Sequence, residues 1–385
     1  MKKIKFIYPP KGPLIFKRMI GDIPDGIKRG EIVEVNNKTG EFFGYAIYNP
    51  KSSIILRIIT REHSENFSIE DYLKKKLISA SKLRKKLELP SDETNAYRLV
   101  HDWGDSMNGI TIDIFDNWAV VELYSYGYYL IKDEIEKILK DIFNGINVYF
   151  SASDYTETME GFKLNEKELN EKVKIKENGV VFEIKIGSGY KSGFFCDQRE
   201  NRQYLTNFVK DKSVLDLFSY TGGFGIYAKK YGASEVTSVD LDEYAISQLK
   251  RNANLNGVRV NAVNSDAFIY MRQLIENKKE YDIVILDPNK LITSREAMEE
   301  GVIKYIDLNK LALRLVKDGG LFVSCSCSGL LSMDDFVNAL RKAASISKKV
   351  VKVFKKTGAS SDHPFMINYP EGEYLKVIWS FVEHG

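Results

Sequence analysis

The feature that most constrains this chain is a regular alternation of apolar strands and helical segments in its second half. After Asp211, strand-like runs end at Phe218, Asp240, Val263, Leu286 and Ser324. Segments with helical spacing lie between or after them, at 223–231, 243–256, 266–277, 297–317 and 332–345. Such alternation requires a parallel sheet with right-handed crossovers, and ligands bind beyond the carboxyl ends of its strands. The runs 350–354 and 374–381 lack a long helix between them and predict an antiparallel pair at the sheet edge.

The first 174 residues follow another pattern. Residues 31–35, 42–48 and 54–59 are β-rich runs separated by turn residues, which predicts a small β-barrel-like module. A helix is expected over 68–87, and seven basic residues are expected on its exposed turns: Lys74, Lys75, Lys76, Lys82, Arg84, Lys85 and Lys86. A strand, strand, helix, strand pattern then predicts an α+β connector. We therefore predict three domains, at 1–70, 71–174 and 175–385, because 385 residues exceed what one core usually carries.

Charge is distributed unevenly along the chain. Residues 1–100 contain 20 Lys and Arg against 12 Asp and Glu, a net charge of +8, so the remainder carries −5 of the overall +3. A basic end on a slightly acidic body suggests a polyanionic partner. A solvated basic face without a partner explains the charge equally well.

Several signals that would indicate another class of protein are missing. Three prolines within residues 9–13 interrupt the N-terminal stretch before a signal peptide could form, and no run approaches the ~18–20 apolar residues of a membrane span. Three cysteines give no disulfide framework and indicate a reducing compartment, so we expect a cytoplasmic protein without membrane contact. The Cys-x-Cys pair lacks a second ligand pair and the four histidines are scattered, so no metal site is predicted.

The sharpest motif is the segment 213–225, Ser-Val-Leu-Asp-Leu-Phe-Ser-Tyr-Thr-Gly-Gly-Phe-Gly. A buried strand brings Asp216 to its end, and Gly222 and Gly223 let a ligand approach the backbone at a helix N-terminus. Asp240 ends the next strand, where it can accept hydrogen bonds from two ribose hydroxyls, and Asp266 follows the third strand, near an adenine amino group. Together these residues predict an adenosine ligand with a charged tail.

Two adenosine cofactors fit that description. The segment 223–228 matches G-x-G-x-x-A, which is weak evidence for a dinucleotide. Four residues separate the strand end from these glycines, and Asp216 would add negative charge near the phosphates. An ammonium-bearing tail tolerates Asp216 better, which favours S-adenosylmethionine. Each of these three acids alone could be a helix cap. That role explains poorly why acids stand at three successive strand ends.

A second constellation follows the fourth and fifth strands. Asp287 and Pro288 end the fourth strand, and Cys327 lies in Ser-Cys-Ser-Cys-Ser-Gly at the end of the fifth. A carboxylate at that edge can bind the Watson–Crick edge of an extruded base. A thiolate beside it is what covalent methylation of a pyrimidine carbon needs. A buried and inert Cys327 is the alternative, and we expect Cys325 to share its face and belong to the core.

With these residues identified, the chain resembles the RlmI-type 23S rRNA (cytosine-C5) methyltransferases over essentially its whole length. That family has a PUA domain, a small EEHEE domain and a Rossmann-like methyltransferase domain. The resemblance rests on motifs in order: 193–202 (Gly-Phe-Phe-Cys-Asp-Gln-Arg-Glu-Asn-Arg), 215–224, 239–240, 265–267, 287–288, 326–329, 362–364 (Asp-His-Pro) and 370–372 (Pro-Glu-Gly).

The resemblance implies a fold and a set of site residues. The fold is a seven-stranded Rossmann-like methyltransferase domain preceded by a β-barrel PUA domain and an α+β connector. The implied S-adenosylmethionine site is lined by Asp216, Phe218, Ser219, Gly222, Gly223, Asp240, Asp266 and Ala267, and closed by Gln198 and Arg202. The resemblance also makes Cys327 the nucleophile and Asp287 the base-contacting acid. It gives the basic first hundred residues a partner, large-subunit ribosomal RNA, and a homodimer is possible.

The chain departs from the family at one place. The family pattern Asp-Pro-Pro-Lys-Phe reads Asp287-Pro-Asn-Lys-Leu291 here, so Asn289 restores a backbone N–H and frees a dihedral in the expected base-binding loop. Two alternatives therefore stay open: methylation of a base nitrogen with a structural Cys327, and a catalytically weak RNA-binding relative. His363 is a candidate for the general base that removes the C5 proton, or a structural loop residue.

Overall fold

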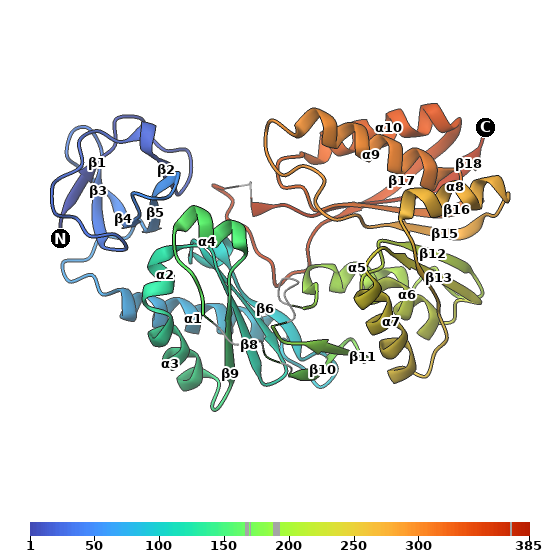
Figure 1. Cartoon of the computed structure of the whole chain (residues 1–385), viewed down its shortest axis with the longest axis horizontal. Coiled ribbons are helices and arrows are strands. Elements are labelled where there is room, and N and C mark those ends of the chain that lie inside the picture. Colours follow the sequence, from blue (N-terminus) through green and yellow to red (C-terminus); the bar gives the residue numbers. More distant parts are fainter. Residues whose placement is uncertain (166–168, 170, 188–192, 370–371) are drawn as a thin grey trace. The chain divides into compact units, whose positions relative to one another are not determined.

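The computed structural model describes residues 1–165, 169, 171–187, 193–369 and 372–385 (Figure 1). The chain forms two compact units. The N-terminal unit comprises Met1–Ile175, Ile184–Cys196 and Ser361–Gly372, and the C-terminal unit comprises Lys176–Glu183, Asp197–Ser360 and Glu373–Gly385. The predicted domain boundaries near 70 and 174 stay predictions.

The C-terminal unit is built on a seven-stranded sheet in the order β14-β13-β12-β15-β16-β18-β17. Its strands are β12 (Ser213–Leu217), β13 (Glu235–Asp240), β14 (Asn261–Asn264), β15 (Tyr281–Leu286), β16 (Val316–Ser326), β17 (Lys349–Thr357) and β18 (Lys376–His384). The first five run parallel, while β18 is antiparallel to both β16 and β17. The predicted parallel sheet and its antiparallel edge pair are therefore confirmed.

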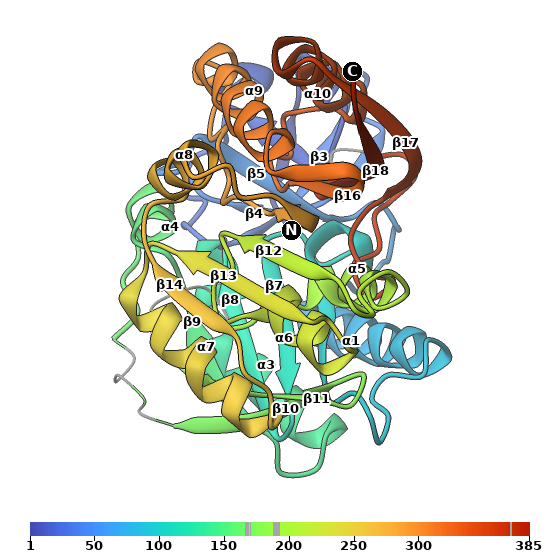
Figure 2. The same ribbon diagram turned by 90° about the vertical axis from the view of Figure 1, so that its right-hand side faces the viewer.

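Helices cover both faces of this sheet (Figures 1 and 2). On one face lie α5 (Arg199–Leu205), α6 (Gly223–Lys230) and α7 (Glu243–Leu255), and on the other lie α8 (Ala267–Glu276), α9 (Met298–Leu313) and α10 (Met333–Ser347). Alternate residues of β12 serve the two faces, since Leu215 and Leu217 belong to the core shared with α8 to α10, whereas Val214 packs with α5 and α6. Both faces are apolar, as a doubly covered parallel sheet requires.

Several predicted boundaries in this unit shift by a few residues, and three of the shifts bear on the site. β12 ends at Leu217 because Phe218 has a left-handed backbone, with φ 62°. The helix predicted to reach residue 317 ends at Leu313, because β16 begins at Val316. β16 extends to Ser326, so Cys325 lies inside the strand and is fully buried, as expected for a core residue.

The N-terminal unit begins with a five-stranded sheet in the order β1-β3-β4-β5-β2. Its strands are β1 (Lys3–Lys5), β2 (Leu14–Phe16), β3 (Ile32–Asn36), β4 (Phe42–Tyr48) and β5 (Ile54–Thr60). Fully buried aliphatic side chains fill its core, among them Ile4, Ile15, Val33, Val35 and Leu56. The three predicted strands are confirmed, and the two short strands β1 and β2 add to them.

A second sheet in this unit has the order β6-β7-β8-β9. Its strands are β6 (Ala96–His101), β7 (Ile110–Phe115), β8 (Trp118–Leu123) and β9 (Asn147–Ser151), joined by α2 (Tyr126–Leu130) and α3 (Lys132–Ile142) and followed by α4 (Asp154–Glu160). The helix α1 (Ile69–Lys86) packs on it, and Ser68 caps α1 by accepting from the Asp71 N–H at 3.2 Å. The hairpin of β10 (Lys172–Glu177) and β11 (Val180–Lys185) follows in the chain, and its residues are divided between the two units.

The sequence prediction for this unit was incomplete, and one expected exposed residue is buried. β6, α4 and the hairpin were missed, since β6 carries Arg98 and His101, which mask its strand pattern. Arg84 was wrong as an exposed residue of α1. It is fully buried, donates from Nη2 to Asp105 Oδ2 at 2.8 Å, and also donates to the Asp362 carbonyl at 2.7 Å.

Candidate active site

The loop that follows β12 has an unusual backbone. Phe218, Tyr220 and Gly222 have φ values of 62°, 47° and 90°, so three of its five residues are left-handed. The loop is held by two backbone hydrogen bonds, from Ser219 N–H to Val239 O at 3.0 Å and from Gly222 N–H to Ser219 O at 2.9 Å. A non-glycine residue in this region costs roughly 1–3 kcal/mol, and such conformations cluster at ligand sites.

Gly222 and Gly223 allow close packing where this loop enters α6. A methyl group at Gly222 would lie 2.8 Å from Leu249 Cγ, and one at Gly223 would lie 3.1 Å from Arg202 Nη1. Gly225 was missed from sequence, although a methyl group there would collide with Ser238 Oγ and lie 3.0 Å from Asp216 Oδ2. These glycines bring the N-terminus of α6 against the ends of β12 and β13.

Asp216 is buried at the end of β12, and only one of its carboxylate oxygens is satisfied. Oδ2 accepts from the Gly225 N–H at 2.9 Å and from Ser238 Oγ at 3.2 Å. No described residue donates to Asp216 Oδ1 or bonds Ser219 Oγ, and both atoms are buried. Burial, together with the Asp240 carboxylate, raises the pKa of Asp216 to about 7.

Asp240, Asp266 and Ala267 lie at the ends of the next two strands. Asp240 Oδ2 accepts from the Tyr220 N–H at 2.8 Å, so this acid also fixes the loop after β12. Asp266 caps α8 through a 3.0 Å bond from the Ile269 N–H to Oδ1. Ala267 is buried as the first residue of α8. Three acids therefore lie at the ends of β12, β13 and β14, which are consecutive neighbours in the sheet.

Gln198 and Arg202 come from the segment before β12, and both are buried. Gln198 Nε2 donates to Asp287 Oδ2 at 3.1 Å, while its Oε1 accepts from Asn201 Nδ2 at 2.7 Å. Arg202 forms a bidentate ion pair with Glu177 of β10, with both N–O distances 2.7 Å. Gln198 therefore reaches the predicted base-binding acid, and Arg202 packs beside Gly223.

The loop residues and acids fit S-adenosylmethionine. A buried carboxylate oxygen without a donor is costly, so the site lacks a positive or hydrogen-donating group at Asp216 Oδ1. The ammonium group of the methionyl tail is such a donor, and it would neutralise a carboxylate whose pKa is raised. A dinucleotide phosphate would instead bring negative charge to this position.

Asp287 lies directly after β15 and is partly buried. Its backbone N–H donates to Leu217 O at 3.3 Å, which joins the ends of β15 and β12. Burial raises the pKa of Asp287 to about 7, with further contributions from the Asp197 and Asp216 carboxylates. A carboxyl group with this pKa carries a proton in a substantial fraction of molecules at neutral pH, so it can donate to a ring nitrogen.

Cys327 follows the last residue of β16 and lies against the loop that carries Asp287. Its Sγ is 3.8 Å from the Pro288 carbonyl oxygen. On the other side, Ser328 Oγ accepts from the Ile292 N–H at 3.1 Å, so the loops after β15 and β16 are joined at two points. Cys327 is partly exposed, unlike Cys325, whose burial raises its thiol pKa well above the usual range. The structure thus brings the predicted thiol and acid to one place.

Two residues beside this pair were missed from sequence. Tyr305 of α9 accepts from Ser326 Oγ at 2.8 Å and lies 2.9 Å from Ser328 Oγ. Lys376 of β18 is buried and donates from Nζ to the Ser328 carbonyl at 2.7 Å. A lone lysine in the apolar strand run was the signal that could have identified Lys376.

His363 belongs to the N-terminal unit. It is buried, its Nδ1 lies 3.0 Å from Asp362 Oδ1, and its ring centroid is 5.0 Å from that of His101. These contacts hold the His363 ring in place, and its role as a general base or as a structural loop residue stays a prediction. In the neighbouring Pro-Glu-Gly motif, Pro370 and Glu371 lie outside the described residues.

A seven-stranded sheet with an antiparallel edge, acids at the ends of three adjacent strands and an unsatisfied buried carboxylate fit an S-adenosylmethionine-dependent methyltransferase. The family model of that description matches residues 158–356, and a PUA-like domain model matches residues 11–61. S-adenosylmethionine is therefore the cofactor, as predicted, and the predicted fold class is confirmed.

Similarity extends over nearly the whole chain. The ribosomal RNA large subunit methyltransferase I of Alteromonas mediterranea is 34% identical over 95% of this chain and 94% of its own, and that of Vibrio parahaemolyticus is 36% identical over 95% and 94%. A solved methyltransferase in complex with S-adenosylhomocysteine has the same fold, with a TM-score of 0.82, 23% identity and coverage of 99% and 100%. The chain belongs to the ribosomal RNA large subunit methyltransferase I family.

Proposed function

We propose that this enzyme transfers a methyl group to C5 of a cytosine in large-subunit ribosomal RNA through a covalent adduct with Cys327. The observation that carries the proposal is the position of the Cys327 thiol, 3.8 Å from the carbonyl of the residue after Asp287. Carbon methylation of a pyrimidine needs a nucleophile and an N3 partner on the same base, and nitrogen methylation does not need the nucleophile.

The chemistry assigns a role to each group. The Cys327 thiolate adds to C6 of an extruded cytosine, the S–C6 bond forms, and the ring electrons move toward C5. Asp287 in its protonated form donates to N3 and stabilises the resulting enamine. S-adenosylmethionine, when bound, supplies an electrophilic methyl group for C5 and leaves as the neutral thioether. Loss of the C5 proton to a base then expels the Cys327 thiolate and restores the aromatic ring.

The cofactor-binding set follows from the loops at the ends of β12, β13 and β14. Asp216 and Ser219 hold the methionyl tail through their unpartnered buried oxygens, and Gly222 and Gly223 permit close approach of the ligand to the backbone. The ribose is held by Asp240 and the adenine by Asp266, with Phe218 and Ala267 as apolar neighbours. Gln198 and Arg202 close the site through their contacts with Asp287 and Glu177.

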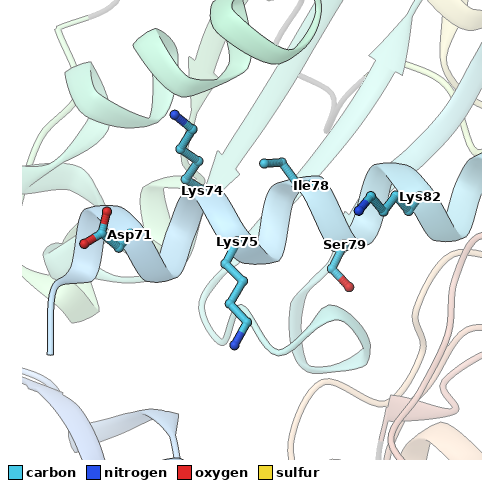
Figure 3. A pocket seen from close by; sticks show the side chains of 6 residues that line it. All are labelled: Asp71, Lys74, Lys75, Ile78, Ser79 and Lys82. Atoms are coloured by element: carbon cyan, nitrogen blue, oxygen red, sulfur yellow. The ribbon is translucent and has the colours of Figure 1, made fainter. Parts of the chain in front are cut away.

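RNA contact is assigned to the basic N-terminal residues. A pocket on α1 is lined by Asp71, Lys74, Lys75, Ile78, Ser79 and Lys82, and in Figure 3 the Lys74 and Lys75 side chains extend away from the helix in different directions. Lys74, Lys75 and Lys82 are exposed. The PUA-like domain and this lysine face together supply sequence-independent contacts to phosphates, which dominate nucleic-acid affinity.

The proposal is tested by measuring methyl transfer to large-subunit ribosomal RNA with tritiated S-adenosylmethionine. We expect labelled 5-methylcytosine with the natural protein and none above background with Cys327→Ala. Mass spectrometry of the nucleosides distinguishes the alternatives. A methyl group on a base nitrogen, or unchanged activity in Cys327→Ala, contradicts the thiol mechanism. Absence of turnover despite RNA binding points to a non-catalytic relative.

Cellular location and assembly follow the same proposal. No helix in the described part of the chain is long and apolar enough to cross a membrane. An enzyme that modifies ribosomal RNA works where ribosomes assemble, so we place it in the cytoplasm. A homodimer stays a prediction, which the molar mass from light scattering tests.

A further inference from the structure

Lys376 is a buried cation whose position is fixed by both its backbone and its side chain. In the antiparallel pairing of β18 with β16, Lys376 lies opposite Ser326, the residue before Cys327. Its Nζ donates to the carbonyl of Ser328, the residue after Cys327, at 2.7 Å, and to the Tyr374 carbonyl at 2.7 Å. The backbone of Lys376 therefore pairs with the residue before Cys327, and its ammonium group binds the carbonyl of the residue after Cys327.

This ammonium group lacks a bound counter-ion. Lys376 is 3% exposed, and within the described ranges no carboxylate pairs with its Nζ, since its partners are two neutral carbonyls. An isolated buried charge costs several kcal/mol, so proteins usually pair or neutralise it. A buried lysine that keeps its positive charge therefore needs an anion beside it during at least part of the reaction.

We propose that the Lys376 ammonium group is the counter-ion of the Cys327 thiolate, and that it keeps the thiol deprotonated and correctly placed for attack on the base. This inference rests on the proposed function, because it assigns a charge partner to the proposed nucleophile. Lys376 acts through Cys327 and is a positioning residue.

The other ionisable groups around this pair do not replace Lys376. Glu373 is exposed, and Tyr374 donates from Oη to Asp197 Oδ2 at 2.5 Å. From α9, Tyr305 is neutral, since burial raises its pKa to about 12, and from the end of β15 comes the acid Asp287. Among these ionisable groups, Lys376 is the cation beside Cys327. Burial lowers its pKa to about 8, against the opposing effects of Cys327 and Glu373.

The pairing has a defined effect on the thiol. Restoring the thiolate after each turnover, when the S–C6 bond breaks, returns the negative charge to the neighbourhood of Lys376. A cation close to an acid lowers its pKa by about 1–3 units. Loss of the cation should therefore leave less thiolate at neutral pH, and a higher pH should compensate for it.

The test is the rate at which iodoacetamide alkylates Cys327 across pH, measured on the full chain without RNA and located by tandem mass spectrometry. Lys376→Gln removes the charge and keeps a donor for the Ser328 carbonyl, and Lys376→Arg keeps the charge. We expect the midpoint of alkylation to rise by about one pH unit or more in Lys376→Gln and to stay close to the natural value in Lys376→Arg.

Methyl transfer supplies a second measurement. In Lys376→Gln, kcat at pH 7 should fall about tenfold, with the deficit shrinking as the pH rises, because more thiolate forms. A purely structural lysine predicts a deficit that does not depend on pH. Lys229→Gln is the matched control, since Lys229 also donates to two carbonyls, Ala233 O at 2.9 Å and Ser234 O at 2.8 Å, in another part of the same unit.

The outcomes separate this inference from the proposed function. An unchanged alkylation midpoint in folded Lys376→Gln overturns the charge pairing, whatever the activity. A raised midpoint together with full activity in Cys327→Ala would leave the ion pair intact and refute the use of Cys327 as nucleophile. If Lys376→Gln fails to fold, Lys376→Arg decides the test. A rise of about one pH unit or more in the alkylation midpoint of Lys376→Arg, which keeps the positive charge, overturns the proposal.

Discussion

The two units of the molecule differ in how far their buried charges are paired, although the C-terminal unit also holds one complete pair, Arg202 with Glu177. In the N-terminal unit, the buried Arg84 is paired with Asp105, and Arg98 holds Asp113 through two bonds of 2.6 and 3.0 Å. In the C-terminal unit, Asp216 keeps one buried oxygen without a donor, and Lys376 bonds only to carbonyls among the described residues.

The difference teaches which buried charges serve structure and which serve chemistry. Arg84 donates to the backbone carbonyls of Arg98 and Asp362 as well as to the Asp105 carboxylate, so its charge is compensated in the folded protein. The acids at the ends of β12 and β15 have raised pKa values, and the lysine of β18 has a lowered one. Incomplete pairing of this kind is common where a ligand or a reaction intermediate completes the charge balance.

After the loss expected for Cys327→Ala, the largest effect on activity should come from Asp287→Asn. This change removes the carboxyl proton that stabilises the enamine, so kcat should fall about 100-fold or more, with the fold intact. Asp282→Asn on the same strand is the control, because Asp282 is bonded to Ser213 and lies 3.0 Å from the Lys317 ammonium. Single-turnover kinetics should separate the two variants. Equal losses of methyl-transfer rate in both would contradict the assignment of Asp287 as the donor to N3.

The largest expected effect on stability comes from the other unit. Arg84→Met leaves the buried Asp105 carboxylate without its partner, which should cost roughly 3–5 kcal/mol of local unfolding free energy. Hydrogen exchange of residues 84–105 measures this locally in a two-unit protein. Lys85→Met, next in sequence but exposed, should change the free energy by less than about 0.5 kcal/mol. A comparable change in both would mean that the Arg84 pair is not a structural element.

Burial of the Asp287 carboxyl group should also make stability depend on pH. The folded protein holds the pKa of Asp287 at about 7 against an ordinary 3.8, so the unfolded chain ionises this group first as the pH rises from about 4 to 7. As the pH rises from about 4 to 7, the free energy of unfolding of the natural protein should therefore fall relative to that of Asp287→Asn. Above this window the difference between the two proteins should stay constant. Thermal unfolding without cofactor at pH 4.5 and 7.5 measures this difference. A constant difference would mean that Asp287 is not destabilised by burial.

The smallest effect is expected at the RNA-contacting face. Replacing Lys74, Lys75 and Lys82 by Ala should weaken RNA binding without changing kcat at saturating RNA. The slope of the logarithm of the binding constant against the logarithm of the salt concentration should become shallower by roughly 2–3. Filter binding at several salt concentrations measures both. Alanine at Lys137 and Lys140 of α3, which lie beside Glu134 and Glu136, is the control. Equal effects in the two sets would make α1 an ordinary solvated face.

Most of the C-terminal fold was predictable because its pattern is local. Each strand is an apolar run followed by a turn and a periodic helix, so the parallel sheet and the acids at its strand ends could be identified from sequence. Asp216, Asp240 and Asp266 follow three neighbouring strands as expected. The order of the strands in space follows from the crossover rule.

What sequence could not supply were contacts between residues far apart in the chain. Lys376 approaches Ser328 only because β18 pairs with β16, and Glu177 reaches Arg202 from a hairpin that was not predicted. Arg84 appears solvated on a basic helix until β6 and the segment around Asp362 cover it. Apart from the lone lysine in an apolar strand run, these residues carry no local signal, since their roles depend on tertiary pairing of charges.

The most direct test of the central claim uses large-subunit ribosomal RNA in which cytidine is replaced by 5-fluorocytidine. Fluorine at C5 cannot leave as a proton, so the bond between Cys327 Sγ and C6 should persist after methyl transfer. The account predicts a cofactor-dependent covalent protein–RNA complex that is stable in denaturing gels, formed by the natural protein and absent in Cys327→Ser. A natural protein that methylates unmodified RNA but forms no such complex, or a complex that survives in Cys327→Ser, would contradict it.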